Sequence, residues 1–217
     1  MCSIFLLTFY SIVLQEKNLK YDPMTTSGEV TVVDEEFVYE KEKTVPLRIY
    51  FPVAEAKAPV LLFSHGLGGS RENNPYLGNH WAGRGYVVVF MQHAGSDDRT
   101  WKDMLALKKF TSLRSAISKE SFDRRKADVP ATLDQLEKWN QKGKKFADRF
   151  DMEKSGMSGH SFGAITTQAL CGQSYGRQRQ AFTDVRIKAA IPMSPSPPDD
   201  GDDKGAFAGV IPLGKLI

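Results

Sequence analysis

The chain has 217 residues, of which 41% are hydrophobic, and its 29 Lys and Arg against 26 Asp and Glu give a formal net charge of +3. This length and apolar content fit one folded domain with a core of its own. Basic and acidic residues are interspersed, which argues against a nucleic-acid-binding protein. The two cysteines and four histidines stand at no disulfide-framework or metal-ligand spacing, so we expect no metal site.

The first 28 residues differ in composition from the rest of the chain. Ile4 to Leu14 is an apolar run as long as a signal-peptide core, but no positive charge precedes it and no small-x-small cleavage site follows. The run is too short to span a bilayer. Three interpretations remain: a degenerate signal segment, the result of a mis-assigned translation start, or an ordinary apolar extension. The sequence therefore does not decide whether the protein is secreted or periplasmic or is cytoplasmic. We assign residues 29–217 to the folded domain.

Strand patterns open the folded domain. Val30–Tyr39 and Val45–Phe51, separated by a charged turn, predict an antiparallel hairpin. The apolar runs Pro59–Ser64 and Tyr86–Gln92 predict strands that are buried on both faces of a parallel sheet. Between them, Pro75–Gly83 is a predicted helix that ends at glycines.

The second half of the chain alternates helix and strand patterns. Residues 96–130 form a long polar segment with helical stretches, and Ala131–Asn140 carries leucines and a tryptophan at helical spacing. A strand over Lys154–Ser158, a helix over Ala164–Leu170 and a strand over Ile187–Met193 follow. This alternation predicts an α/β fold with a mostly parallel central sheet behind the leading antiparallel hairpin.

Four polar residues directly follow predicted strands: His65, His93, Ser161 and Ser194. Because active groups of parallel sheets collect at the carboxyl ends of the strands, we expect these residues to face one crevice.

Apolar residues between Asp97 and Pro130 are interspersed with lysines and arginines. The apolar residues predict the packed face of a surface helix, or else a cap over the pocket that selects acyl chains. The basic side chains predict a solvated face, with weak attraction to anionic lipid headgroups as the alternative. These basic residues are Lys102, Lys108, Lys109, Arg114, Arg124, Arg125 and Lys126.

A serine between two glycines carries the functional argument. Gly159-His160-Ser161-Phe162-Gly163 has the G-x-S-x-G spacing of a nucleophile on a sharp strand-to-helix turn, where only glycine lets strand and helix approach. Upstream, a glycine-rich turn follows the strand that ends at Ser64, and its backbone N–H groups can bind an oxyanion. In hydrolases with such a turn the second donor is the amide after the nucleophile, here Phe162. The two motifs together indicate acyl transfer.

On these residues the chain resembles the α/β-hydrolase superfamily, and within it the predicted dienelactone-hydrolase and platelet-activating-factor acetylhydrolase-like branch. The resemblance implies that Ser161 is the nucleophile and that the N–H groups of Leu67 and Phe162 form the oxyanion hole. It implies hydrolysis of a small-molecule ester or lipid-like substrate, without a metal or an organic cofactor. The matching segments lie at residues 63–73, 92–97, 156–164 and 191–195.

The chain departs from this family where the rest of the triad belongs. No carboxylate stands at the tip of the strand that ends in Pro192-Met193-Ser194-Pro195, and no histidine follows His160. The aspartates at 199, 200, 202 and 203 come later, in a predicted loop, and a last strand begins near Val210. We therefore expect an α/β-hydrolase domain that is truncated at its C-terminus, lacks its last strands and helix, and can self-associate through an exposed sheet edge.

None of the four histidines is an obvious replacement base. His65 is expected to brace the oxyanion turn, His160 to point away from the serine hydroxyl, and His80 to be a plain helix residue. His93 would need Asp97 or Asp98 as its partner acid. The sequence thus indicates a serine esterase for short acyl chains that is impaired by the missing acid and base. The alternatives are a non-catalytic protein of this fold that binds an acyl ligand or a partner, and a product with no stable fold.

Overall fold

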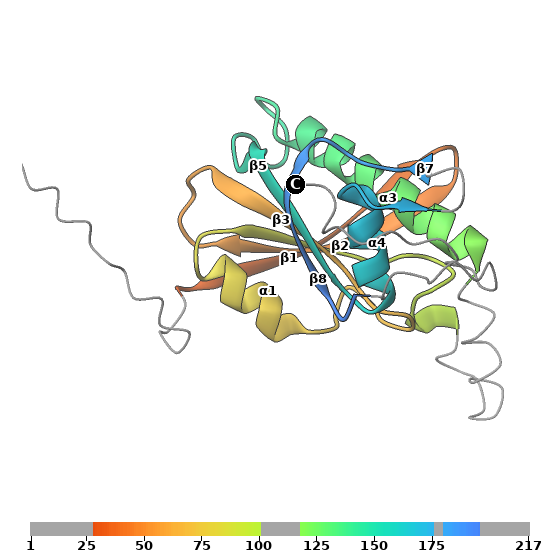
Figure 1. The fold of residues 1–217 in the computed structure, drawn as a ribbon. Coiled ribbons are helices and arrows are strands. Elements are labelled where there is room, and N and C mark those ends of the chain that lie inside the picture. Colours follow the sequence, from red (N-terminus) through yellow and green to blue (C-terminus); the bar gives the residue numbers. More distant parts are fainter. Residues whose placement is uncertain (1–27, 101–117, 176–179, 196–217) are drawn as a thin grey trace, which may run out of the picture.

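The structure is a computed structural model of the chain, and it describes residues 28–100, 118–175 and 180–195 (Figure 1). The longer elements in chain order are β1 (Val30–Tyr39), β2 (Lys43–Pro52), β3 (Ala58–Ser64), α1 (Pro75–Ala82), β4 (Val87–Met91), α3 (Lys119–Trp139), β5 (Phe150–His160), α4 (Phe162–Leu170) and β8 (Ile187–Met193). The short ones are the 3-10 turn η1 (Asp98–Thr100) and the two-residue strands β6 (Ser174–Tyr175) and β7 (Gln180–Ala181).

Six of the described strands form the central sheet, in the order β1-β2-β4-β3-β5-β8. β1 pairs antiparallel with β2, and β2 pairs antiparallel with β4. From β4 onward every pair is parallel. The prediction of a mostly parallel sheet with a leading antiparallel hairpin is therefore confirmed.

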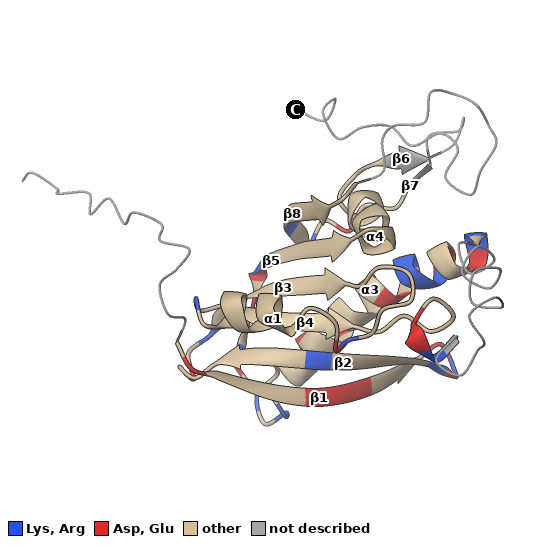
Figure 2. Cartoon of the chain, turned by 90° about the horizontal axis from the view of Figure 1, so that it is seen from below, with Lys and Arg blue, Asp and Glu red and all other residues tan. Residues whose placement is uncertain are grey.

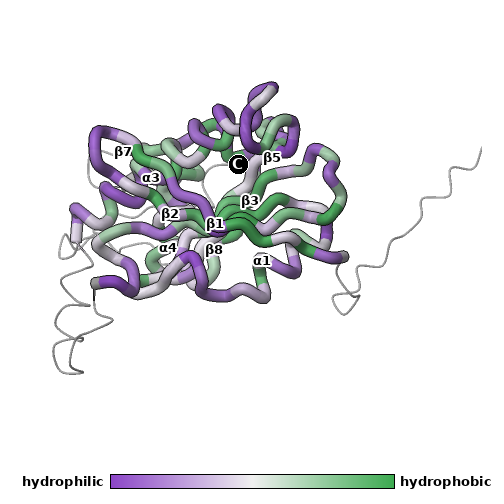
Figure 3. The backbone as a smooth tube through the Cα atoms, turned by 180° about the vertical axis from the view of Figure 1, so that it is seen from behind, coloured by the Kyte–Doolittle hydropathy of each residue, from purple (hydrophilic) through white to green (hydrophobic). Residues whose placement is uncertain are grey.

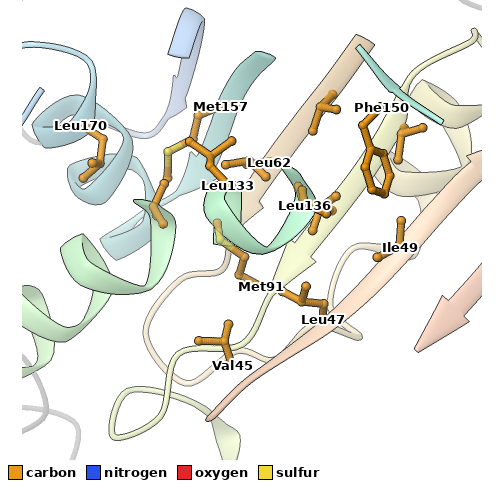
Figure 4. Close-up of a cluster of buried hydrophobic side chains, with 14 of the residues drawn as sticks. Val45, Leu47, Ile49, Leu62, Met91, Leu133, Leu136, Phe150, Met157 and Leu170 are labelled. Carbon is orange, nitrogen blue, oxygen red and sulfur yellow. The ribbon is translucent and has the colours of Figure 1, made fainter. Parts of the chain in front are cut away.

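The sheet is covered on both faces, because alternate strand residues point to opposite sides. In β4, Val87, Val89 and Met91 belong to the core cluster that α3 and α4 cover, while Val88 and Phe90 pack on the α1 side. Figure 4 shows the larger cluster, and Figure 3 shows that the central strands are the most hydrophobic part of the backbone. This explains why the central strands read as unbroken apolar runs.

Helix α3 differs most from its predicted extent. It begins at Lys119, where the Ser118 hydroxyl accepts a hydrogen bond from the Ser121 amide, and it continues through Pro130. A proline inside a helix removes one backbone hydrogen bond. The helix continues because residues on both sides of Pro130, including Val129 and Leu133, are fully buried in the core cluster.

Strand β5 is also longer than predicted. It begins at Phe150, four residues before Lys154, and its pairing with β3 and with β8 contains register shifts. The polar residues at its start disguise it as a loop in the sequence. The β6–β7 pair is a further element that the sequence analysis did not anticipate.

Several expectations concern residues outside the described ranges: the signal-like segment, the apolar residues between 101 and 117, the aspartates near residue 200 and the strand near Val210. Within the described ranges, no helix combines the length and the hydropathy that crossing a membrane requires. Strand β8 pairs only with β5 among the described strands, so self-association through this edge stays a prediction.

Candidate active site

Ser161 lies between the end of β5 and the start of α4. Its backbone has φ 55° and ψ −116°, in a region that non-glycine residues rarely occupy. Its amide donates to the Met193 carbonyl oxygen at 3.0 Å, and its own carbonyl accepts from the Ala164 amide at 2.9 Å. The residue is exposed while its neighbours Gly159 and Phe162 are buried. A strained backbone therefore presents this side chain at the end of the sheet.

The two flanking glycines are required by close backbone contacts. A Cβ on Gly159 would overlap the Gly163 carbonyl, and a Cβ on Gly163 would overlap the Ser64 carbonyl oxygen. The helix α4 thus crosses β3 and β5 with main-chain atoms in direct contact. This is the physical reason for the glycine spacing in the motif.

The glycine-rich turn after β3 lies beside Ser161. A Cβ added to Gly66 would be 3.5 Å from the Ser161 Cβ. The Gly68 amide donates to the Ser96 carbonyl at 2.9 Å and the Gly69 amide to the Gly66 carbonyl at 3.2 Å. Among the backbone hydrogen bonds of the described residues, none has the Leu67 N–H as its donor. The hydrogen bonds of the described residues therefore anchor the turn on both sides of the Leu67 amide without engaging that amide.

His65 braces this turn. Its Nδ1 is 2.6 Å from the Gly66 carbonyl oxygen, and its Nε2 accepts from the His93 amide at 3.1 Å. A carbonyl only accepts, so Nδ1 carries the proton and the ring is neutral. Burial, and then the nearby charge of Arg125, hold the pKa of His65 well below its usual value. Both ring nitrogens are occupied, so neither is available to Ser161.

His93 is the centre of a buried hydrogen-bonded array. Its Nδ1 is 2.8 Å from Asp128 Oδ2 and its Nε2 is 2.9 Å from the Ser64 hydroxyl, and all three residues have no exposed surface. Burial and the charge of Arg125 lower the pKa of His93, although the Asp128 carboxylate opposes them. The array has the atoms of a Ser-His-Asp triad, but it is sealed inside the protein.

The predicted partner acid of His93 was therefore wrong. Asp97 instead accepts from Gln92 Nε2 at 2.8 Å and from Arg99 Nε at 2.7 Å. Burial raises the pKa of Asp128, but the hydrogen bonds from His93 and Tyr39 and the charge of Arg124 outweigh it and lower the net value. Asp128 is on α3, far along the chain, where sequence proximity gives no hint of the pairing.

The expectation that Arg125 belongs to a solvated basic face was also wrong. Figure 2 shows both charge signs along α3, yet the Arg125 side chain has no exposed surface. Arg125 and Asp128 are in phase with Phe122, Val129 and Leu133 on the buried face of the helix. That phase is the signal that could have identified both residues as buried.

The other two described histidines, His80 and His160, also make no hydrogen bond to the Ser161 hydroxyl. His80 is on α1, where Arg84 Nη1 is 3.1 Å from its Nδ1. His160 is exposed and precedes Ser161 directly. No hydrogen bond connects a histidine ring to the Ser161 hydroxyl among the described residues, and those residues contain no His, Cys, Asp and Glu group that could hold a metal ion. The four strand-end residues thus do not share one crevice, because His65 and His93 are buried below it.

Comparisons with known proteins agree with this architecture. The sequence matches the family model of platelet-activating factor acetylhydrolase, isoform II, over residues 52–100, which include β3, the glycine-rich turn after it and β4 but not Ser161. A comparison with curated proteins finds no match. Among solved structures, the chain is similar to a protein assigned as a dienelactone hydrolase from Klebsiella pneumoniae subsp. pneumoniae MGH 78578, with a TM-score of 0.57 at 13% identity over 84% of this chain and 66% of that one.

Two esterases give similar values. The ferulic acid esterase of Streptomyces cinnamoneus has a TM-score of 0.53 at 17% identity over 82% of this chain and 63% of that one. The acetyl xylan esterase of Paenibacillus sp. R4 has a TM-score of 0.52 at 18% identity over 82% of this chain and 51% of that one. The chain has an α/β-hydrolase fold. It spans about half to two thirds of the length of these three relatives.

Proposed function

We propose that this α/β-hydrolase chain is a serine esterase in which Ser161 is the nucleophile and the N–H groups of Leu67 and Phe162 form the oxyanion hole. The observation that carries the proposal is the backbone of Ser161, which is held at φ 55° on the turn between β5 and α4. Strain of this kind persists only where the surrounding contacts impose it, here the glycine contacts at both sides of the turn. It serves to present a hydroxyl.

The chemistry follows from this placement. The Ser161 Oγ attacks the ester carbonyl carbon, the new C–O bond forms, and the carbonyl electrons move onto the oxygen, which accepts from the two amides. Collapse of this intermediate breaks the bond to the leaving alcohol and leaves an acyl group on Ser161. The proton lost from the Ser161 hydroxyl passes to solvent water, and the leaving alcohol takes up a proton from water. Water then attacks the acyl group, and the acid and the free serine are released.

The expected weakness of the enzyme is proton transfer. In the described residues both buried histidines use their ring nitrogens elsewhere. A serine with an oxyanion hole but no base retains a rate enhancement of roughly a thousandfold over water. We therefore propose that this chain on its own hydrolyses esters slowly.

The proposed substrates are small carboxylic esters with short acyl chains. Support comes from the matched family, whose name denotes an acetylhydrolase, and from the acetyl xylan esterase among the similar structures. A p-nitrophenyl acetate assay is the matching probe for turnover.

Covalent labelling with a fluorophosphonate tests the nucleophile without requiring full turnover. We expect Ser161 to be labelled and the Ser161→Ala variant to remain unlabelled. Ser194→Ala is the matched control, because Ser194 is also exposed, follows a strand and has a positive φ of 57°. Labelling that survives Ser161→Ala, or no labelling of the folded wild-type chain, would contradict the proposal.

A non-catalytic protein that binds an acyl ligand is the second candidate. The observation in its favour is that no described histidine reaches the Ser161 hydroxyl. The two functions separate in the p-nitrophenyl acetate assay: equal rates for the wild-type chain and Ser161→Ala would favour binding alone.

A further inference from the structure

Arg125 is a buried cation that binds neutral oxygens. Its Nη1 donates to the His65 carbonyl at 2.6 Å and its Nε to the Ser96 hydroxyl at 2.9 Å. Its Nη2 is 3.4 Å from the Gly66 carbonyl oxygen. Burial lowers the pKa of Arg125 to about 9, against the effect of the Asp128 and Asp97 carboxylates, so the guanidinium is charged at neutral pH. Burying a charged guanidinium this deeply has a large desolvation cost, so we looked for a function that its contacts could serve.

The guanidinium, His65 Nδ1 and the Gly69 amide together hold the direction of the peptide that bears the proposed Leu67 donor. The Gly66 carbonyl faces Arg125 and His65 Nδ1, and the described residues contain no cis peptide bond. In a trans peptide the N–H points opposite to the C=O. The Leu67 N–H therefore points away from Arg125, while the Gly66 α-carbon faces the Ser161 side chain.

The same guanidinium contacts the second donor residue. Its central carbon is 4.3 Å from the centre of the Phe162 ring, which is within the range of a cation–π interaction. One side chain of α3 thus touches both the turn that bears Leu67 and the residue directly after Ser161. A cation on the carbonyl side of a peptide also polarises its N–H and makes it a stronger donor.

We propose that Arg125 is a positioning residue that orients and polarises the Leu67 amide of the proposed oxyanion hole, and that its contact with the Phe162 ring holds the residue after Ser161 in place. This inference rests on the proposed function of Ser161, Leu67 and Phe162. The planar fork of the guanidinium spans several acceptors at once, which the point charge of a lysine cannot do. The residue would touch neither the ester nor the reacting atoms.

The test compares Arg125→Gln with Arg124→Gln in the fluorophosphonate reaction. Arg124 is the matched control: it is the adjacent arginine on α3, but it donates to Asp128 Oδ1 at 2.8 Å and the Thr44 carbonyl at 3.0 Å, away from the turn. Loss of a whole oxyanion donor slows catalysis by about a hundredfold to a thousandfold. For a donor that is misdirected but not removed, we expect Arg125→Gln to slow labelling of Ser161 by about ten- to a hundredfold, mainly in the maximal rate of inactivation. Arg124→Gln should stay within about twofold.

Rescue distinguishes positioning from simple filling of space. Arg125→Ala with sub-denaturing guanidinium ion should regain part of the labelling rate, and Arg125→Lys should label at an intermediate rate. A wild-type rate in folded Arg125→Gln would overturn the inference while leaving the proposed function intact. If Arg125→Gln and Arg125→Lys both lose cooperative melting, or guanidinium restores nothing, the residue is structural and the inference fails. Absence of Ser161 labelling in the wild-type chain would instead refute the proposed function.

Discussion

The crossing of α4 over β3 makes Gly163→Ala a sharp test of the fold around Ser161. A Cβ at this position would lie 2.6 Å from the Ser64 carbonyl carbon and 2.9 Å from the His65 carbonyl oxygen, besides overlapping the Ser64 oxygen. All three are main-chain atoms. Ser64 is also the last residue of β3 and is held in register with β4 and β5. The added methyl therefore cannot be accommodated by rotating a side chain.

The expected loss of stability follows from two opposing effects. Overpacking of this kind typically destabilises by up to about 3 kcal/mol. Replacing glycine by alanine within a helix returns about 1 kcal/mol. At the upper end of that range the free energy of unfolding should thus fall by about 2 kcal/mol, which for a domain of this size lowers the melting temperature by roughly 4–8 °C.

Thermal melting followed by circular dichroism measures this change. Gly28→Ala is the control, because its added Cβ would meet only the Gly83 carbonyl oxygen at 3.4 Å, an ordinary contact. Gly163→Ala should also slow fluorophosphonate labelling, since any shift of Ser64 and His65 moves the glycine-rich turn that follows β3. A variant that melts within about 1 °C of the wild-type chain and is labelled at the same rate would refute the close-contact reasoning.

Two further outcomes are expected from the buried array. The depressed pKa values of His65 and His93 mean that the unfolded chain binds protons on these rings more readily than the folded chain does. Their contribution to stability is therefore present above about pH 6.5 and is lost as the pH falls below it. Urea denaturation should give a lower free energy of unfolding at pH 5.5 than at pH 6.5, by about 1 kcal/mol for each ring that stays neutral in the folded chain, and a flat profile would contradict the assigned neutral rings. Asp128→Asn leaves the buried His93 N–H and the Arg124 charge poorly matched and should destabilise by about 3 kcal/mol in the same assay. Asp134→Asn is the control, because Asp134 pairs with Arg186 on the exposed side of the same helix; it should change stability by less than about 1 kcal/mol. Equal losses for the two variants would show that the buried array contributes no more to stability than a surface ion pair.

The sequence predicts the sheet well because its strands leave local patterns, and burial on both faces makes the central strand β4 an unbroken apolar run. The strand at Val30–Tyr39 and the strand at Ile187–Met193 have their predicted bounds, and the run around Val88 is a central strand. The glycine spacing around Ser161 also predicts a real turn, since it reflects contacts between main-chain atoms. These features are local, so a short window of sequence contains them.

The buried polar array beneath the glycine-rich turn after β3 could not be predicted in the same way. Asp128 pairs with a histidine 35 residues earlier, and Arg125 binds a carbonyl 60 residues earlier. Charged residues are usually on the surface, so the run Arg124-Arg125-Lys126 reads as a solvated face. In the sequence, Arg125 differs from Arg124 and Lys126 only in lying four residues before Val129, on the apolar face of the helix. Long-range polar pairing of this kind is decided by the tertiary structure.

The polar array also bears on how α3 finds its place during folding. Apolar side chains such as Leu133 and Leu136 would tolerate a helix that docks one turn too far along the sheet, because dispersion contacts have little directional preference. Such a misdocked helix would strand a guanidinium and a carboxylate in an apolar interior, at a cost of several kcal/mol for each ion. Arg125 and Asp128 therefore penalise every misaligned docking of α3, and the turn beside Ser161 gains its contacts with Arg125 only when the helix is in register.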